Sequence, residues 1–297
     1  MHSSTLVSAT NPAVPAAPSR RRAVWTFFRR DPAAAAAALY LAVIVLVALA
    51  APLVTPFAYD RQDLDATLRG PHRGHLLGTD NFGRDVLARV AFGARISLSV
   101  AAIAVAAEVV VGTLWGTLAG LAGGRGDAWM MRVVDLLIAF PALLLAILIT
   151  GIFGPSLINI IVALVATAWP GMARIVRSEV VALREREFVE AARAAGASTR
   201  RIVGRHLLPN VLHLVAARST LDVSAIILIE AALSFVGVGV QPPRPSWGLM
   251  INEAFPYLRS QPYLLAFPAA FLSLVVISLN VFGEALADAL DPYRRRR

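Results

Sequence analysis

Long uncharged, apolar runs alternate with short polar segments along this chain. Residues 32–59 and 263–283 carry no charge, and residues 96–124 carry only Glu108. A helix needs about 20 apolar residues to cross the roughly 30 Å hydrocarbon core of a bilayer. Each run is long enough, so the pattern predicts an all-α, polytopic membrane protein.

A further uncharged run, residues 136–173, is too long for one crossing. It contains the turn signal Gly151-Ile152-Phe153-Gly154-Pro155-Ser156, which predicts two spans joined by a tight hairpin. A secretory signal peptide is the alternative for the first run, but that run exceeds the usual apolar core of about 7–15 residues. The sequence therefore predicts six membrane-spanning helices, at residues 33–56, 96–124, the two halves of 136–173, 214–240 and 263–283.

The arginines orient this topology. All 28 basic residues are arginine, and most lie in alternate segments, which predicts that these segments face the cytoplasm. We expect a bacterial inner-membrane protein with both termini inside, and a net charge of +9 that faces the membrane rather than nucleic acid. The predicted segments are an N-terminal cytoplasmic tail (1–32), a periplasmic loop (57–95), a long cytoplasmic loop (174–212) and a basic C-terminal tail (289–297).

Composition also excludes several chemistries. Without lysine the chain has no Walker A loop for nucleotide and no Schiff-base amine. Without cysteine it has no thiolate metal site or disulfide, and its five histidines show no metalloprotease spacing. We predict that the chain is not an enzyme and needs no cofactor or metal.

The long cytoplasmic loop is the most informative segment. Residues 185–195 are mostly strong helix formers, and Gly196 follows where a helix would be capped. Ser198 or Thr199 is placed to start a second helix along the membrane surface, which we expect Pro209 to stop. From these residues alone, a partner-binding projection and an ordinary interfacial helix pair are equally good interpretations.

The spacing of this loop resembles the "EAA" loop of bacterial ABC importer permeases. In that family the first short helix couples the permease to an ATPase subunit. The resemblance implies ATPase-coupling roles for Glu187, Glu190, Ala191, Ala192, Gly196, Leu208 and Pro209.

Other segments are similar to the C-type permeases of dipeptide, oligopeptide and nickel importers, over roughly residues 27–293. They are His75 to Asp80, Gly83 to Asp85, Gly93 to Leu98, Gln241 to Gly248 without Arg244, and Asp288 to Pro292. His206 stands where many permeases have isoleucine, although this subfamily often carries histidine there.

The resemblance implies the type I ABC permease fold, with its transmembrane domain at residues 96–288. It also implies four kinds of partner: a homologous second permease, two cytoplasmic ATP-binding subunits, an extracytoplasmic solute-binding protein and membrane lipid. The substrate stays open among dipeptide, oligopeptide, nickel chelate and glutathione.

Some residues have two interpretations. Glu108 and Glu230 lie inside predicted spans, where they are either structural partners or a proton path in a secondary transporter. Internal inverted repeats, which many secondary transporters contain, are not detected. On the outer side, a turn-fixing role competes with contact to the binding protein for Asp80, Arg84 and Asp85, and Trp247 is a further candidate for that contact. His206 is expected to pack at the interface, with a transient nickel-ligand role as the alternative.

Overall fold

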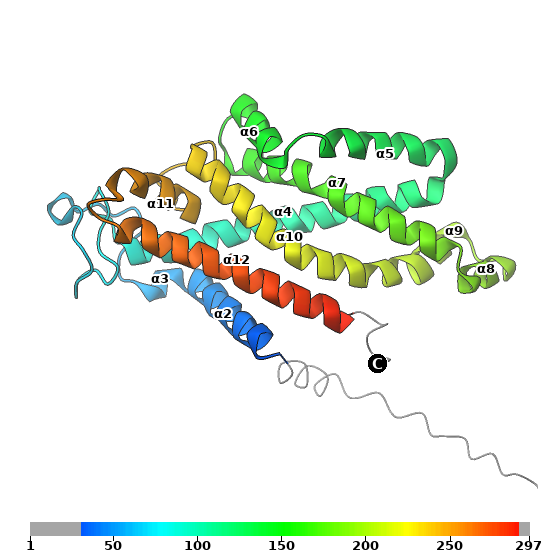
Figure 1. Cartoon of the computed structure of the whole chain (residues 1–297), viewed down its shortest axis with the longest axis horizontal. Helices are drawn as coiled ribbons and strands as arrows, with labels where there is room; N and C mark the ends of the chain where they lie inside the picture. The colour runs from blue at the N-terminus through cyan, green and yellow to red at the C-terminus, as the bar shows by residue number, and fades with distance from the viewer. Residues whose placement is uncertain (1–30, 291–297) are drawn as a thin grey trace, which may run out of the picture.

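The computed structural model describes residues 31–290, and the predicted tails lie largely outside them. The described residues form helices joined by turns and loops, with two isolated β-bridges and no strand (Figure 1). The elements are α2 (Pro32–Leu49), α3 (Ala51–Val54), η1 (Leu64–Ala66), α4 (Val86–Ala122), α5 (Gly124–Ile138), α6 (Ala142–Phe153), α7 (Leu157–Arg184), α8 (Glu187–Ala194), α9 (Thr199–Ile202), η2 (Val203–Leu207), α10 (Leu208–Val236), α11 (Trp247–Ala254), η3 (Phe255–Tyr257) and α12 (Tyr263–Leu290).

Five helical segments in the described part of the chain are long and apolar enough to cross a membrane. They are Pro32–Leu49, Val86–Ala122, Leu157–Arg184, Thr199–Val236 and Tyr263–Ala289. In Figure 1, α11 and the loop before α4 lie at one end of the bundle, and α8 and α9 lie at the other. The helices α2, α4, α10 and α12 pack along their lengths between these ends.

The third predicted span is not a single helix. Its residues are divided between α5 and α6, which meet at a bend of 84°. Pro141 precedes α6, and with 12 residues α6 reaches only about 18 Å, too short to cross alone. The chain has six spans only if this bent pair counts as one.

The second span begins at Val86, ten positions before the predicted Ile96. The arginines in this stretch suggested a loop, but Arg89 is only 1% exposed and pairs with acidic side chains. Its charge therefore does not interrupt the helix. Asp85 caps the new start by accepting a hydrogen bond from the Ala88 amide at 2.6 Å.

Pro209 does not stop the second loop helix, contrary to the prediction. It lies in the first turn of α10, directly after a π-helical turn (η2) that joins α9 to α10. The fifth span is thus the continuation of the loop helix from Thr199 to Val236.

Glycines in α4 allow its close contact with α7. A Cβ on Gly112 would lie 2.6 Å from the Met172 Cβ, and one on Gly120 would lie 2.8 Å from the Val180 Cγ1. Gly116, midway between them, would clash with the Ala173 carbonyl oxygen. Sequence analysis missed this row, although a glycine at every fourth position of an apolar segment is a helix-packing signal in membranes.

Candidate functional site

The short helix α8 projects from one end of the bundle (Figure 1). Val189 is its only buried residue, and it packs into an apolar cluster with Ile202, Leu207 and Val211. Glu187, Glu190 and Ala191 are exposed, and Ala192 is half-buried. One apolar anchor thus holds a helix whose other face is open.

The end of α8 follows the sequence prediction. Gly196 has a φ of +80°, a conformation that glycine adopts without a Cβ penalty. Its amide donates to the Arg193 carbonyl at 2.9 Å, and the Ala197 amide donates to the Ala192 carbonyl at 3.0 Å. These bonds satisfy carbonyls at the helix end, so the glycine break predicted from the sequence is confirmed.

The second part of the loop packs against α8. Ser198 caps α9, as predicted, by accepting a hydrogen bond from the Arg201 amide at 3.4 Å. The His206 ring lies 6.2 Å from that of Phe188 in α8, which favours the packing interpretation of this histidine. Leu208 is half-buried and Pro209 is exposed. The predicted coupling residues therefore occupy one end of the molecule.

At the opposite end, Asp80 organises a buried network of charges. Its Oδ1 accepts from the amides of Phe82 and Arg84, both at 2.9 Å. Its Oδ2 accepts from the Arg84 Nε at 2.7 Å and the Arg89 Nη1 at 2.5 Å. Both arginines also reach Glu253 of α11, so two positive charges face two negative charges.

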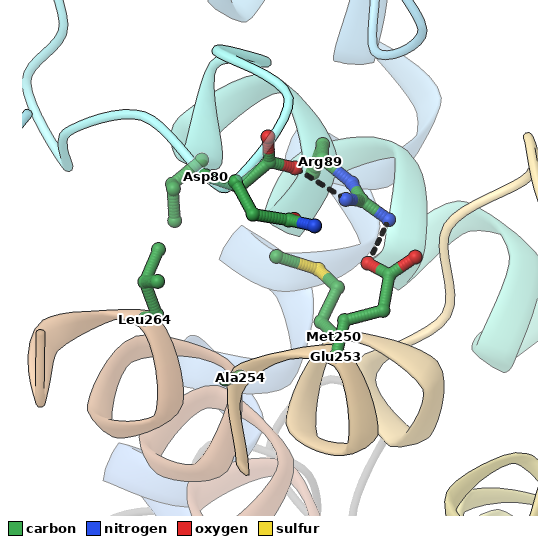
Figure 2. A pocket seen from close by; sticks show the side chains of 8 residues that line it. Asp80, Arg89, Met250, Glu253, Ala254 and Leu264 are labelled. Carbon is green, nitrogen blue, oxygen red and sulfur yellow. Dashed lines mark hydrogen bonds and ion pairs between the residues drawn. The ribbon is translucent and has the colours of Figure 1, made fainter. Parts of the chain in front are cut away.

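Figure 2 shows Arg89 between Asp80 and Glu253. A cavity of about 20 Å³ lies beside it, next to Met250 and Leu264. That volume is enough for one water molecule. These ion pairs connect the loop before α4 to α11, and the buried Nε of Arg89 has no hydrogen-bond partner among the described residues.

The remaining outer residues are also buried. Asp85 is 3% exposed and binds the His75 Nδ1 at 2.8 Å, besides capping α4. Trp247 is fully buried, and its indole donates to the Val90 carbonyl at 3.2 Å. This burial favours the structural role for Asp80, Arg84, Asp85 and Trp247. Contact between them and a binding protein stays a prediction.

The two glutamates that the sequence analysis singled out, Glu108 and Glu230, are both buried. Glu230 accepts hydrogen bonds from Ser97 at 3.0 Å and from Ser234 at 2.8 Å. Glu108 faces Asp222 of α10, a carboxylate that Arg218 binds at 3.0 Å. The serine partners of Glu230 favour its structural interpretation.

Comparison with known proteins places this architecture in a family. The description "binding-protein-dependent transport system inner membrane component" matches residues 112–296, and "N-terminal TM domain of oligopeptide transport permease C" matches residues 19–71. The methionine ABC transporter MetNI, in an inward-facing form, has the same fold over 67% of this chain and 94% of its own, with a TM-score of 0.55 and 21% identity.

Several relatives match nearly end to end. The oligopeptide transport system permease protein OppC of Haemophilus influenzae is 41% identical, with 90% of this chain and 87% of that protein covered. The dipeptide permease protein DppC of Bacillus subtilis is 41% identical (92% and 85% covered), and OppC of Escherichia coli is 42% identical (92% and 93% covered). The chain therefore belongs to the inner-membrane permease components of binding-protein-dependent transport systems, as a multi-pass transport subunit and not an enzyme.

Proposed function

We propose that this chain is a membrane subunit of an ATP-driven importer of short peptides. The relatives named above are oligopeptide and dipeptide permeases, and a further one, 37% identical, is a glutathione permease of Pectobacterium atrosepticum. Glutathione is itself a small peptide, so one substrate class includes all three names. A nickel chelate remains the alternative substrate.

The exposed face of α8 is the observation that carries the coupling proposal. A helix of eight residues with a single buried anchor is too short to be stable on its own in water. The alanines of α8 allow a partner protein to approach closely, and Glu190 offers a carboxylate to a groove on that partner. We infer that α8 inserts into an ATP-binding subunit and transmits movement to α7 and α10, the long helices on either side of the loop.

The orientation follows from the arginine distribution. Counting α5 and α6 as one crossing returns both termini to the side of α8, which is the arginine-rich, cytoplasmic side. The outer network around Asp80 then faces the periplasm, where a solute-binding protein would dock. A second, homologous permease would complete the translocation pathway across the membrane.

Uptake assays test this proposal. With its ATP-binding subunits and binding protein, the permease should take up labelled dipeptide or oligopeptide, unlabelled peptide should compete, and nickel chelates should not. ATP depletion should stop uptake.

Glu108→Gln and Glu230→Gln should leave uptake within a few-fold of normal, because an amide retains most of the hydrogen-bonding capacity. Uptake that survives ATP depletion but is lost in either variant would establish the proton-coupled alternative.

A further inference from the structure

The long helix α10 carries an arginine–aspartate pair near its middle. Asp222 is the central residue of the helix Leu208–Val236. The Arg218 Nε donates to the Asp222 Oδ2 at 3.0 Å, and the Arg218 Nη2 lies 2.9 Å from the Asp222 Oδ1. Arg218 is nearer than Asp222 to the end of α10 that joins the loop of α8 and α9. Its guanidinium therefore reaches away from that loop, toward the middle of the span.

The two partners of this pair are exposed to different extents. The Asp222 side chain is 9% exposed, whereas the Arg218 side chain is 44% exposed. Glu108 of α4 lies beside Asp222 and is 1% exposed, and its Oε2 has no hydrogen-bond partner among the described residues. The acidic part of this cluster is thus buried between α4 and α10, and the guanidinium is its accessible part.

The surroundings of Arg218 indicate water and not lipid. A charged side chain inside a span is costly against hydrocarbon, and such side chains usually face a bundle interior or a water-filled cavity. Near a helix end arginine avoids this cost by extending to the membrane surface, but Arg218 extends inward to Asp222. Asn210 and His213 are also exposed between the loop and Arg218, whereas the exposed residues from 223 to 236 are all apolar. The polar half of α10 therefore indicates a water-filled path that reaches Arg218 from the end that carries α8.

We propose that Arg218 binds the carboxylate of the transported peptide during its passage through the membrane. This inference rests on the proposed transport of peptides, and it does not depend on the coupling role of α8. A guanidinium binds a carboxylate through two parallel hydrogen bonds, which is how Arg218 holds Asp222. The carboxylate of a peptide offers the same two oxygen atoms to the exposed guanidinium.

Asp222 makes this binding site weak. It neutralises Arg218 and competes with the substrate for the same donors, so a peptide is held only briefly. A site along a transport path must bind strongly enough to admit its substrate and weakly enough to release it. Replacement of Asp222 by asparagine should therefore strengthen peptide binding, and removal of the guanidinium should weaken it.

The test measures whether a peptide protects a thiol placed beyond Arg218. Ala225 is exposed seven residues further along α10, a spacing that returns to the same face of a helix. The chain has no cysteine, so Ala225→Cys introduces a single thiol. The permease is assembled with cysteine-free partner subunits in inverted membrane vesicles, without binding protein or ATP. A water-soluble methanethiosulfonate should label this thiol, triglycine should slow the labelling, and triglycine amide, which lacks the carboxylate, should not.

Two controls accompany this measurement. Leu46→Cys, at a position 63% exposed on the apolar helix α2, should not be labelled. In the Ala225→Cys background, Arg218→Gln with Asp222→Asn removes the guanidinium without leaving a buried charge unpaired. This double variant should assemble normally, but half-protection should need about ten times more triglycine. Asp222→Asn alone should need less triglycine than the wild-type pair.

Three results would overturn the inference. They are no labelling of Ala225→Cys, which would mean that lipid or the second permease covers this face, equal protection by triglycine and its amide, and undiminished protection in the double variant. The comparison of triglycine with its amide uses the wild-type pair, so it does not depend on assembly of the double variant. Peptide uptake by the unmodified chain, with binding protein and ATP, tests the proposed function separately. If the chain imports peptide and any of these results is found, only the assignment of Arg218 fails.

Discussion

Gly196→Leu is expected to abolish transport while the permease remains folded in the membrane. The φ of +80° at this position costs a residue with a Cβ about 1–3 kcal/mol, so leucine would pull the end of α8 out of its present geometry. No atom lies within 4 Å of the position that the Cβ would take, so the effect comes from the backbone and not from a clash. Co-purification of the ATP-binding subunits and peptide uptake should both fall.

Two matched variants isolate this cause. Gly196→Asn should retain much of the activity, because asparagine tolerates positive φ better than other side chains. Gly204→Leu lies in the same loop, also has open space around the Cβ, and has a φ that any residue adopts, so it should cost much less. Normal uptake by a wild-type amount of Gly196→Leu protein would contradict the coupling role of this segment.

Gly116→Leu should have the other large effect, a loss of folded permease. Its side chain would occupy the space of the Ala173 carbonyl and lie within 2.8 Å of the Val176 Cβ, forcing α4 and α7 apart. Overpacking a core costs about 1–3 kcal/mol, and more where backbones cannot move. The yield of monodisperse permease and its melting temperature in detergent measure this loss.

Gly171→Leu is the control for Gly116. It lies on the partner helix α7, and no atom lies within 4 Å of its Cβ position. It should therefore leave the yield and the melting temperature close to those of the wild type. Equal behaviour of the two variants would mean that the glycine row of α4 does not set the distance between these helices.

The sequence was most informative where local chemistry decides the structure. Gly196 and Ser198 carry their own capping signals, so the end of α8 and the start of α9 were predictable from the residues alone. Uncharged length likewise identified the first, fourth and sixth spans, and a run broken only by Glu108 identified most of the second. Helix caps and uncharged runs are both determined by residues that lie close together in the sequence.

Predictions failed where distant residues decide. The charge of Arg89 predicted a loop. In the structure Arg89 is paired with Asp80 and Glu253, which are far apart in the sequence, so it lies inside a helix instead. The attachment of α5 to α7 through Asp127 and Asp135 likewise joins residues far apart in the sequence. Trp247 looked available to a partner, but its full burial depends on packing against α4.

The central claim, that α8 docks into a cytoplasmic ATP-binding subunit, is most directly tested by cross-linking. The chain has no cysteine, so Ala191→Cys places a single thiol on the exposed face of α8. We expect this thiol to cross-link to the ATP-binding subunit and to react with impermeant reagents only from the cytoplasmic side. Ser260→Cys, exposed before α12, should react only from outside. Labelling of Ala191→Cys from outside, or no cross-link in an assembled and active transporter, would contradict the claim.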